Sequence, residues 1–167
     1  MLNRRMVLLG STALGGCATF NANAGKVATD VGLIADGLKG VLTQLGSLNI
    51  PQLTPSVMST VGSAVASLEA LAQQIAAASS TAAQQPLVQQ IYTYVSRIVA
   101  VLTPILAAIP ATAGIAVALQ AAQVLLPIIF AAVNLVLPAS APAVPGSIPL
   151  TPDEARLILR GKAQMAK

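Results

Sequence analysis

The sequence predicts an all-α protein, on three observations. Hydrophobic residues make up 55% of the 167 residues, mainly Ala, Leu, Val and Ile, whereas aromatic residues account for 2%. The regularly spaced Gly and Pro clusters of all-β proteins are missing. Apolar residues recur at alternating spacings of four and three, which places them on one stripe of a helix. We therefore expect helical hairpins forming one four-helix bundle-like domain, followed by a Pro-rich spacer and a short C-terminal helix.

The first sixteen residues contain the parts of an export signal. Arg4 and Arg5 precede an apolar run from Met6 to Leu14, and Gly15 and Gly16 follow it. A basic segment, a short apolar run and small residues before a cleavage point are typical of signal peptides, and the run is short for a membrane span. We expect residues 1–16 to be removed from the mature protein.

The segment Leu14-Gly15-Gly16-Cys17 resembles the lipobox of bacterial lipoproteins. This resemblance implies cleavage before Cys17, a diacylglyceryl group on its thiol, and acylated Cys17 as the new N-terminus. Several acyl chains would make the anchoring effectively permanent. Residues 3–8, Asn-Arg-Arg-Met-Val-Leu, are also similar to a twin-arginine export signal. Ala18, where lipoproteins retained at the inner membrane carry Asp, implies an outer-membrane location facing the periplasm.

Simple secretion is the alternative to lipid attachment. Ala22-Asn23-Ala24 is an acceptable cleavage site, and cleavage there would discard Cys17 with the signal. However, Cys17 is the only cysteine, so it cannot form an intramolecular disulfide, and a stray thiol has little use in an exported protein. The lone cysteine therefore favours lipid attachment.

Residues 17–25 are small and polar, which predicts a lipidated tether ahead of the first helix. The first helix is expected over residues 26–48, because one stripe carries Val27, Val31, Ile34, Leu38, Val41, Leu45 and Leu48. On its solvent-exposed face we expect two charged pairs, Lys26 with Asp30 and Asp36 with Lys39.

Proline marks the starts of the next two helices. Thr54-Pro55 combines a capping residue with a proline at the first helical position, which predicts a helix over residues 55–78 antiparallel to the first. Its expected stripe is Val57, Val61, Ala64, Leu68, Leu71 and Ile75. Pro86 then predicts the start of a third helix, over residues 87–109, after a linker at residues 79–85.

The third helix and the fourth, expected over residues 111–137, are apolar nearly all round. No charged residue lies between Arg97 and Asp153. Such helices belong either to the centre of a bundle or to a membrane, and lengths of about 34 and 40 Å would cross a bilayer core of about 30 Å. The polar residues and prolines within the two helices favour burial in a bundle or oligomer over insertion.

The two apolar helices are expected to form an antiparallel hairpin that turns at Pro110. Residues whose numbers sum to about 220 then lie at the same level. This register brings Arg97 level with Gln123 and one turn from Gln120, so a polar cluster of these three side chains would satisfy the lone charge. Alternatively, the aliphatic part of the Arg97 side chain lies along the hairpin and the guanidinium reaches water at its edge.

The C-terminal region is expected to stand apart from the bundle. Residues 138–150 contain four prolines and predict an extended spacer, whereas residues 151–167 begin with Thr151-Pro152 and predict a basic helix. That helix is either a solvated end or a docking surface for an anionic membrane or acidic partner; its cations are Arg156, Arg160 and Lys162. We expect its deletion to leave the stability of the bundle nearly unchanged.

Composition argues against catalysis. The chain has no histidine, its only cysteine is expected to carry lipid, and its five carboxylates are scattered at positions 30, 36, 69, 153 and 154. We therefore expect no catalytic residue, no metal and no cofactor apart from the covalent lipid. The net charge falls from +4 to +2 once Arg4 and Arg5 leave, and basic and aromatic residues do not interleave, so nucleic acid is not an expected partner.

These observations predict a non-enzymatic, lipid-anchored envelope protein that acts as a structural or interaction module at the membrane. Charged residues are 8% of the chain, against about a quarter in a typical soluble domain, so something other than water is expected to cover part of it. A protein partner or a second copy would do so. The alternatives are a helical hairpin that inserts into a bilayer and perturbs it, and a carrier of a lipid-like ligand.

Overall fold

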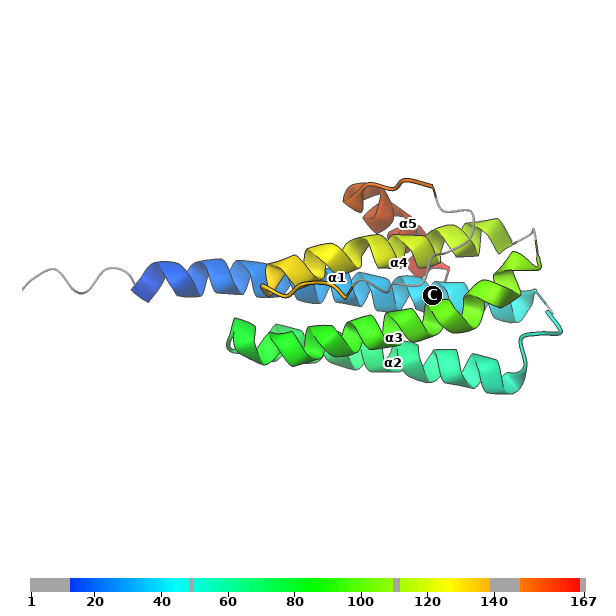
Figure 1. The fold of residues 1–167 in the computed structure, drawn as a ribbon, viewed down its shortest axis with the longest axis horizontal. Helices are drawn as coiled ribbons and strands as arrows, with labels where there is room; N and C mark the ends of the chain where they lie inside the picture. The colour runs from blue at the N-terminus through cyan, green and yellow to red at the C-terminus, as the bar shows by residue number, and fades with distance from the viewer. Residues whose placement is uncertain (1–12, 49, 110–111, 139–147, 166–167) are drawn as a thin grey trace, which may run out of the picture.

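A computed structural model describes residues 13–48, 50–109, 112–138 and 148–165, and within these ranges the only regular elements are helices (Figure 1). The prediction of an all-α protein is confirmed. Residues 1–12, which hold most of the expected signal peptide, lie outside the described residues. The helices are α1 (Ala13–Ser47), α2 (Pro55–Ala77), α3 (Thr81–Ala107), α4 (Ala113–Ala132) and α5 (Pro152–Gln164).

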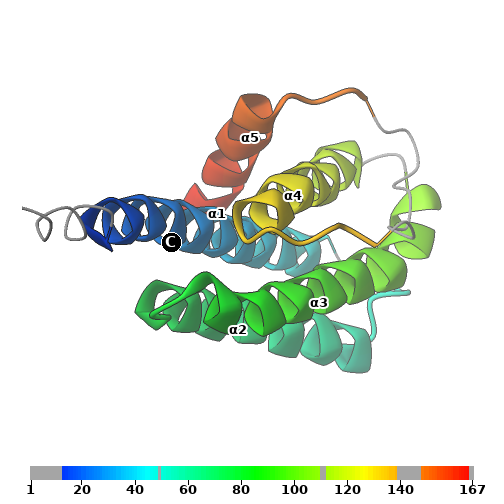
Figure 2. The ribbon, with the colours of Figure 1, turned by 60° about the vertical axis from the view of Figure 1, so that its left-hand side comes forward.

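The first four helices form a ring in which α1 contacts α2, α2 contacts α3, α3 contacts α4, and α4 returns to α1. Short connections make successive helices antiparallel, as in an up-and-down bundle. The fifth helix, α5, lies against α1 and α4, on the opposite side of α1 from α2 and α3 (Figure 2). The fold is therefore a four-helix bundle with one additional helix packed on one face.

The predicted apolar stripes of α1 and α2 point into the core. In α1, all of the stripe from Val27 to Leu45 is at most 2% exposed, and only Leu48, beyond the helix end, is 37% exposed. In α2, every stripe residue from Val61 to Ile75 is buried, and Thr54 caps the helix by accepting a hydrogen bond from the Val57 amide. Each buried aliphatic side chain stabilises the fold by about 1.5–3 kcal/mol, and the four glycines within residues 26–48 are tolerated for this reason.

The expected tether at residues 17–25 is wrong, because these residues continue α1, which begins at Ala13. The segment is rich in alanine and contains no proline. Once the buried part of α1 is helical, adding residues at its N-terminal end costs little, since the unfavourable nucleation step has already occurred. The chain from Cys17 into the bundle is therefore a continuous helix.

Two helix ends differ from the prediction, and a residue at each end explains the difference. Helix α3 begins at Thr81, within the expected linker, since the Ser80 side chain accepts a hydrogen bond from the Ala83 amide and caps the helix. Helix α4 ends at Ala132 rather than 137 because Asn134 adopts a left-handed conformation with φ 56°. The Leu135 amide then donates to the Phe130 carbonyl at 2.9 Å, which is the hydrogen bond of a Schellman ending.

The antiparallel register of α3 and α4 is as predicted. The rings of Tyr92 and Phe130 meet edge to face with centroids 5.9 Å apart, and their numbers sum to 222. The Gln85 Nε2 donates to the Val133 carbonyl at 3.1 Å, and these numbers sum to 218. The turn of the hairpin contains Pro110, which lies outside the described residues.

The apolar circumference of α4 has a structural explanation, since α4 is contacted by α1, α3 and α5. Among the described residues, α3 and α4 are the helices long and apolar enough to cross a membrane by length and composition. Within the apolar 18-residue segment of each helix, 56% of α4 is buried, against 33% of α3. A core helix of a soluble bundle has the same composition as a membrane span.

Helix α5 packs into the bundle, so the expectation that it stands apart is wrong. Ala155 and Leu159 are fully buried against α1 and α4. A Cβ atom placed on Gly37 would lie 3.1 Å from the Leu159 Cβ, and one on Gly40 would lie 2.5 Å from the Lys162 carbonyl carbon. These two glycines let the α5 backbone approach α1 closely. Deleting residues 151–167 would therefore remove part of the core.

The end of the expected spacer is also attached to the bundle. Residues 139–147 lie outside the described residues, but Ile148, Pro149 and Leu150, which precede α5 without regular secondary structure, are described. Gln120 of α4 forms two hydrogen bonds with the backbone of Ile148: its Nε2 donates to the Ile148 carbonyl, and its Oε1 accepts from the Ile148 amide at 3.1 Å. This pair positions the chain for the start of α5.

Candidate functional site

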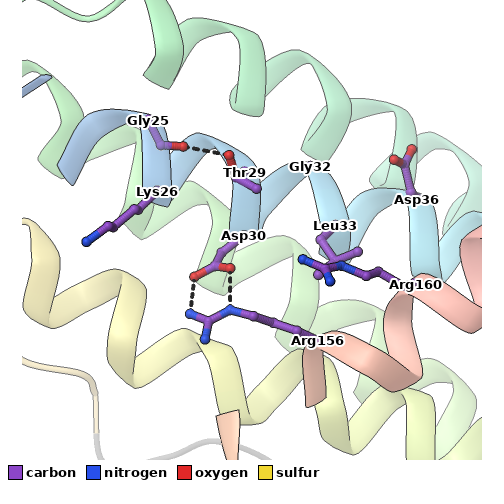
Figure 3. Close-up of a pocket in the computed structure, with 9 residues that line it drawn as sticks. All are labelled: Gly25, Lys26, Thr29, Asp30, Gly32, Leu33, Asp36, Arg156 and Arg160. Carbon is purple, nitrogen blue, oxygen red and sulfur yellow. Dashed lines mark hydrogen bonds and ion pairs between the residues drawn. The ribbon is translucent and has the colours of Figure 1, made fainter. Parts of the chain in front are cut away.

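A polar cleft with a volume of about 890 Å³ lies between α1 and α5 (Figure 3). We call it the α1–α5 cleft. Its charged lining consists of Lys26, Asp30 and Asp36 from α1 and Arg156 and Arg160 from α5. The remaining lining residues are Gly25, Thr29, Gly32 and Leu33. Residues more than 100 positions apart in the sequence therefore form one site.

A bidentate ion pair closes one side of the α1–α5 cleft. The Arg156 Nε and Nη2 atoms donate to the two carboxylate oxygens of Asp30, each at 2.8 Å, and Nη1 donates to Asp153 at 3.0 Å. The Asp30 side chain is 9% exposed and that of Arg156 is 28% exposed. The hydrogen bonds to Asp30 raise the pKa of Arg156 above its ordinary value. All three guanidinium nitrogens are thus occupied by protein carboxylates.

The charged pairs predicted within α1 are wrong, because each partner belongs to another helix. Asp30 pairs with Arg156 rather than Lys26, and Lys39 pairs with Glu69 of α2, with Nζ and Oε1 3.1 Å apart. The Lys39 pair is exposed and contributes at most about 1 kcal/mol. Spacing along one helix allows a pair, but the neighbouring helix decides which pair forms.

The expected docking cations of α5 are largely used within the fold. Arg156 binds Asp30, and the Lys162 Nζ donates to the Gln44 Oε1 at 2.6 Å. Burial lowers the pKa of Lys162. Arg160 is exposed, and its side chain extends from α5 over Leu33 in Figure 3. Two of the three cations therefore hold α5 on α1, whereas Arg160 is exposed.

The N-terminus of α5 has the predicted capping box. The Glu154 amide donates to the Thr151 hydroxyl oxygen at 3.4 Å, and the Thr151 amide donates to the Glu154 carboxylate at 2.7 Å. The Thr151 amide and the Thr151 hydroxyl, which also donates to the Glu154 carboxylate at 2.7 Å, lower the pKa of Glu154. The cap is therefore complete above the ordinary pKa of a glutamate and is lost as the pH falls through the lowered pKa.

The polar cluster predicted from Arg97, Gln120 and Gln123 is not formed as expected. Gln120 is 9% exposed and holds Ile148, whereas Arg97 is exposed and lies beside α2. Gln123 is half-buried. The register of the hairpin was correct, but Arg97 lies outside the buried stripe of α3, on the side facing α2 rather than α4.

The two positions predict opposite results on mutation. Gln120→Leu should destabilise the fold by about 1–3 kcal/mol, because the amide and carbonyl of Ile148 lose their partners. Arg97→Met should change stability by less than about 0.5 kcal/mol, since the side chain is exposed. Urea denaturation of both variants would check this. Equal losses in the two variants would instead favour the cluster predicted from the sequence.

The predicted lipid site, Cys17, lies in the first turns of α1, and the positions of side chains in residues 13–22 are not described. Lipid attachment therefore stays a prediction. Within the described residues, no group of three or more His, Cys, Asp or Glu side chains is placed to hold a metal ion.

Sequence reasoning missed the α1–α5 cleft. Gly37 and Gly40 were a usable signal, because paired glycines on one helix face permit a close neighbour. Asp30, directly before the stripe residue Val31, was another. No protein-family model, curated protein or solved structure matches this chain.

Proposed function

We propose that this chain is an exported lipoprotein, anchored through acyl chains on Cys17, whose helical domain is a non-enzymatic structural or interaction module at the outer membrane, facing the periplasm. The observation that carries the proposal is Leu14-Gly15-Gly16-Cys17, which follows a basic segment and a short apolar run. The outer-membrane location rests on Ala18 in the position after the cysteine.

The continuity of α1 supports a module held close to the membrane. Helix α1 runs without a break from Cys17 to Ser47, and its first described buried side chain is Ala24. Seven residues of helix span about 10 Å, so the bundle would begin close to the headgroups. Attachment through a helix also fixes the orientation of the bundle more firmly than a flexible tether would.

The packing of α4 supports a module that sits on the membrane rather than in it. Its most apolar residues, including Leu119, Leu126 and Ile129, are at most 1% exposed because α1, α3 and α5 cover them. The bundle thus covers these apolar surfaces itself. A partner protein or a second copy would cover the exposed apolar part of α3.

The test is the mass of the mature protein. Chain purified from membranes should begin at Cys17 and carry the mass of the acyl chains, and Cys17→Ser should abolish both the cleavage and the added mass. Intact-mass spectrometry checks this. An unmodified mature protein that begins at Gly25 would instead establish the secreted alternative.

Bilayer insertion of the α3–α4 hairpin is the second candidate function, because both helices are long and apolar enough to span a membrane. An alkaline carbonate wash of membranes containing the Cys17→Ser variant separates the two candidates. A surface module should be released, whereas an inserted hairpin should stay with the membrane. The third alternative, a carrier of a lipid-like ligand, is less favoured, because charged side chains line much of the α1–α5 cleft.

A further inference from the structure

A second polar depression, which we call the α2–α3 groove, has a volume of about 380 Å³. It is lined by Ser59, Thr60, Ser63, Ala64 and Ser67 of α2 and by Tyr94 and Arg97 of α3. We propose that this groove binds a small anionic saccharide, a sugar that carries a phosphate or carboxylate group, with the Arg97 guanidinium on the anionic group and the hydroxyls on the sugar. The proposal does not depend on lipid attachment at Cys17.

The charge of the groove is unbalanced. Arg97 is the only charged residue in its lining, and the nearest acid along α2, Glu69, is bonded to Lys39 at 3.1 Å. In the α1–α5 cleft, by contrast, Asp30 and Asp36 accompany the cations. A guanidinium presents parallel N–H groups that fit both oxygens of a carboxylate or phosphate. An arginine in a depression with no lining carboxylate therefore favours an anion.

The hydroxyls of the groove are arranged on one face of α2. Ser59, Ser63 and Ser67 are four residues apart, so they lie one above another along the helix. The Ser67 hydroxyl donates to the Ser63 carbonyl at 2.9 Å, whereas the described residues offer no partner to the hydroxyls of Ser59 and Ser63. Serine is also less favourable than alanine inside a helix. Hydroxyls that accept and donate suit the several hydroxyls of a sugar.

Close helix packing does not explain these small side chains. Small residues bring two helices together when the partner fills the space above them, as α5 does at Gly37 and Gly40. Beside Ser59 and Ser63 the space stays open, with Tyr94 and Arg97 at its edge. Its volume lies within the range of about 300–1,000 Å³ that is common for small-molecule sites. Tyr94 supplies an apolar ring face and a hydroxyl, which matches the mixed character of a sugar ring.

The groove is distant from the expected lipid site. The Lys39–Glu69 pair sets the levels of α1 and α2, which places Ser63 beside about residue 45 of α1, roughly 42 Å along the helix from Cys17. Headgroups extend only several ångströms beyond the hydrocarbon core. A soluble saccharide therefore fits this position better than a headgroup of the membrane that would hold the lipid anchor.

The experiment measures binding by titration calorimetry of the full chain with glucose 1-phosphate and glucuronate, and with glucose as the uncharged comparison. We expect at least one anionic sugar to bind and glucose to bind more weakly. The Arg97→Met substitution should lower the affinity for the anionic sugar by about tenfold or more. Arg160→Met is the matched control, since it removes an exposed arginine from the other cleft and should bind like the unmodified chain. Circular dichroism and thermal melting verify that both variants are folded.

Three results would overturn the proposal. The first is no binding of either anionic sugar by the unmodified chain at millimolar concentration. The second is equal binding by the Arg97→Met variant. The third is binding confined to phosphatidylglycerol vesicles and lost in Arg97→Met, which would make the ligand a lipid headgroup. Since none of these measurements involves Cys17, they leave the proposed anchoring unaffected.

Discussion

Gly40→Ala should destabilise the folded protein by about 3 kcal/mol, the upper end of the usual cost of inserting an extra carbon into a well-packed contact. The added Cβ would overlap the backbone carbonyl of Lys162, 2.5 Å from its carbon atom. A backbone atom cannot rotate out of the way as the end of a side chain can, so α5 must move away from α1. Leu159, which is fully buried, would then lose much of its packing.

Gly32→Ala is the matched control for Gly40→Ala. Both glycines lie within α1, but a Cβ at Gly32 would meet nothing within 4 Å. Alanine is favoured over glycine in a helix by up to about 1 kcal/mol, so Gly32→Ala should be neutral or stabilising. Urea denaturation compares the two variants, and hydrogen exchange shows whether α5 loses protection. If Gly40→Ala proved as stable as Gly32→Ala, the close packing of α5 on α1 would be wrong.

Arg156→Met should destabilise the protein by about 3 kcal/mol. The Asp30 carboxylate, which is 9% exposed in the unmodified protein, would lose its partner, and removing one partner of a buried ion pair is strongly unfavourable. The effect is at the lower end of the usual range because Arg156 itself is 28% exposed. Arg160→Met, which removes an exposed cation four residues later, should change stability by less than about 0.5 kcal/mol.

A double mutant separates the ion pair from its surroundings. Asp30→Leu combined with Arg156→Met removes both charges and leaves apolar side chains in the same space, so it should recover much of the stability lost in Arg156→Met. Thermal and urea unfolding of the single and double variants give the coupling between the two residues. Strictly additive losses would mean that Asp30 and Arg156 do not act as a pair.

Because α5 packs on α1 and α4, its basic residues have a different role from the one expected of a separate helix. A basic C-terminal helix on its own is a natural docking element for anionic surfaces. In this protein, however, Arg156 and Lys162 face α1 and form hydrogen bonds with Asp30 and Gln44. Another exposed arginine, Arg97, lies in the α2–α3 groove, where no carboxylate lines the depression.

The features that could be predicted from the sequence are those that depend on residues close together along the chain. The all-α class, the stripes of α1 and α2, the cap at Thr54 and the capping box at Thr151 all follow from spacings of four residues or fewer. The level of α3 against α4 was also predictable, because a short turn in an antiparallel hairpin leaves little freedom in register. The start of α3 and the end of α4 differ from the prediction because Ser80 caps α3 and Asn134 adopts a left-handed conformation after α4.

Which helix faces contact each other could not be predicted in this way, because it depends on how distant segments pack. Four prolines before α5 indicated that the helix would stop, but not where the chain would lead next. Asp30 and Arg156 are 126 residues apart, and no local pattern joins them. Arg97 was placed at the right level and on the wrong side, because a helix apolar nearly all round does not indicate which side faces which neighbour. Those choices depend on close contacts such as that of Gly40 with Lys162, which form only when distant segments pack together.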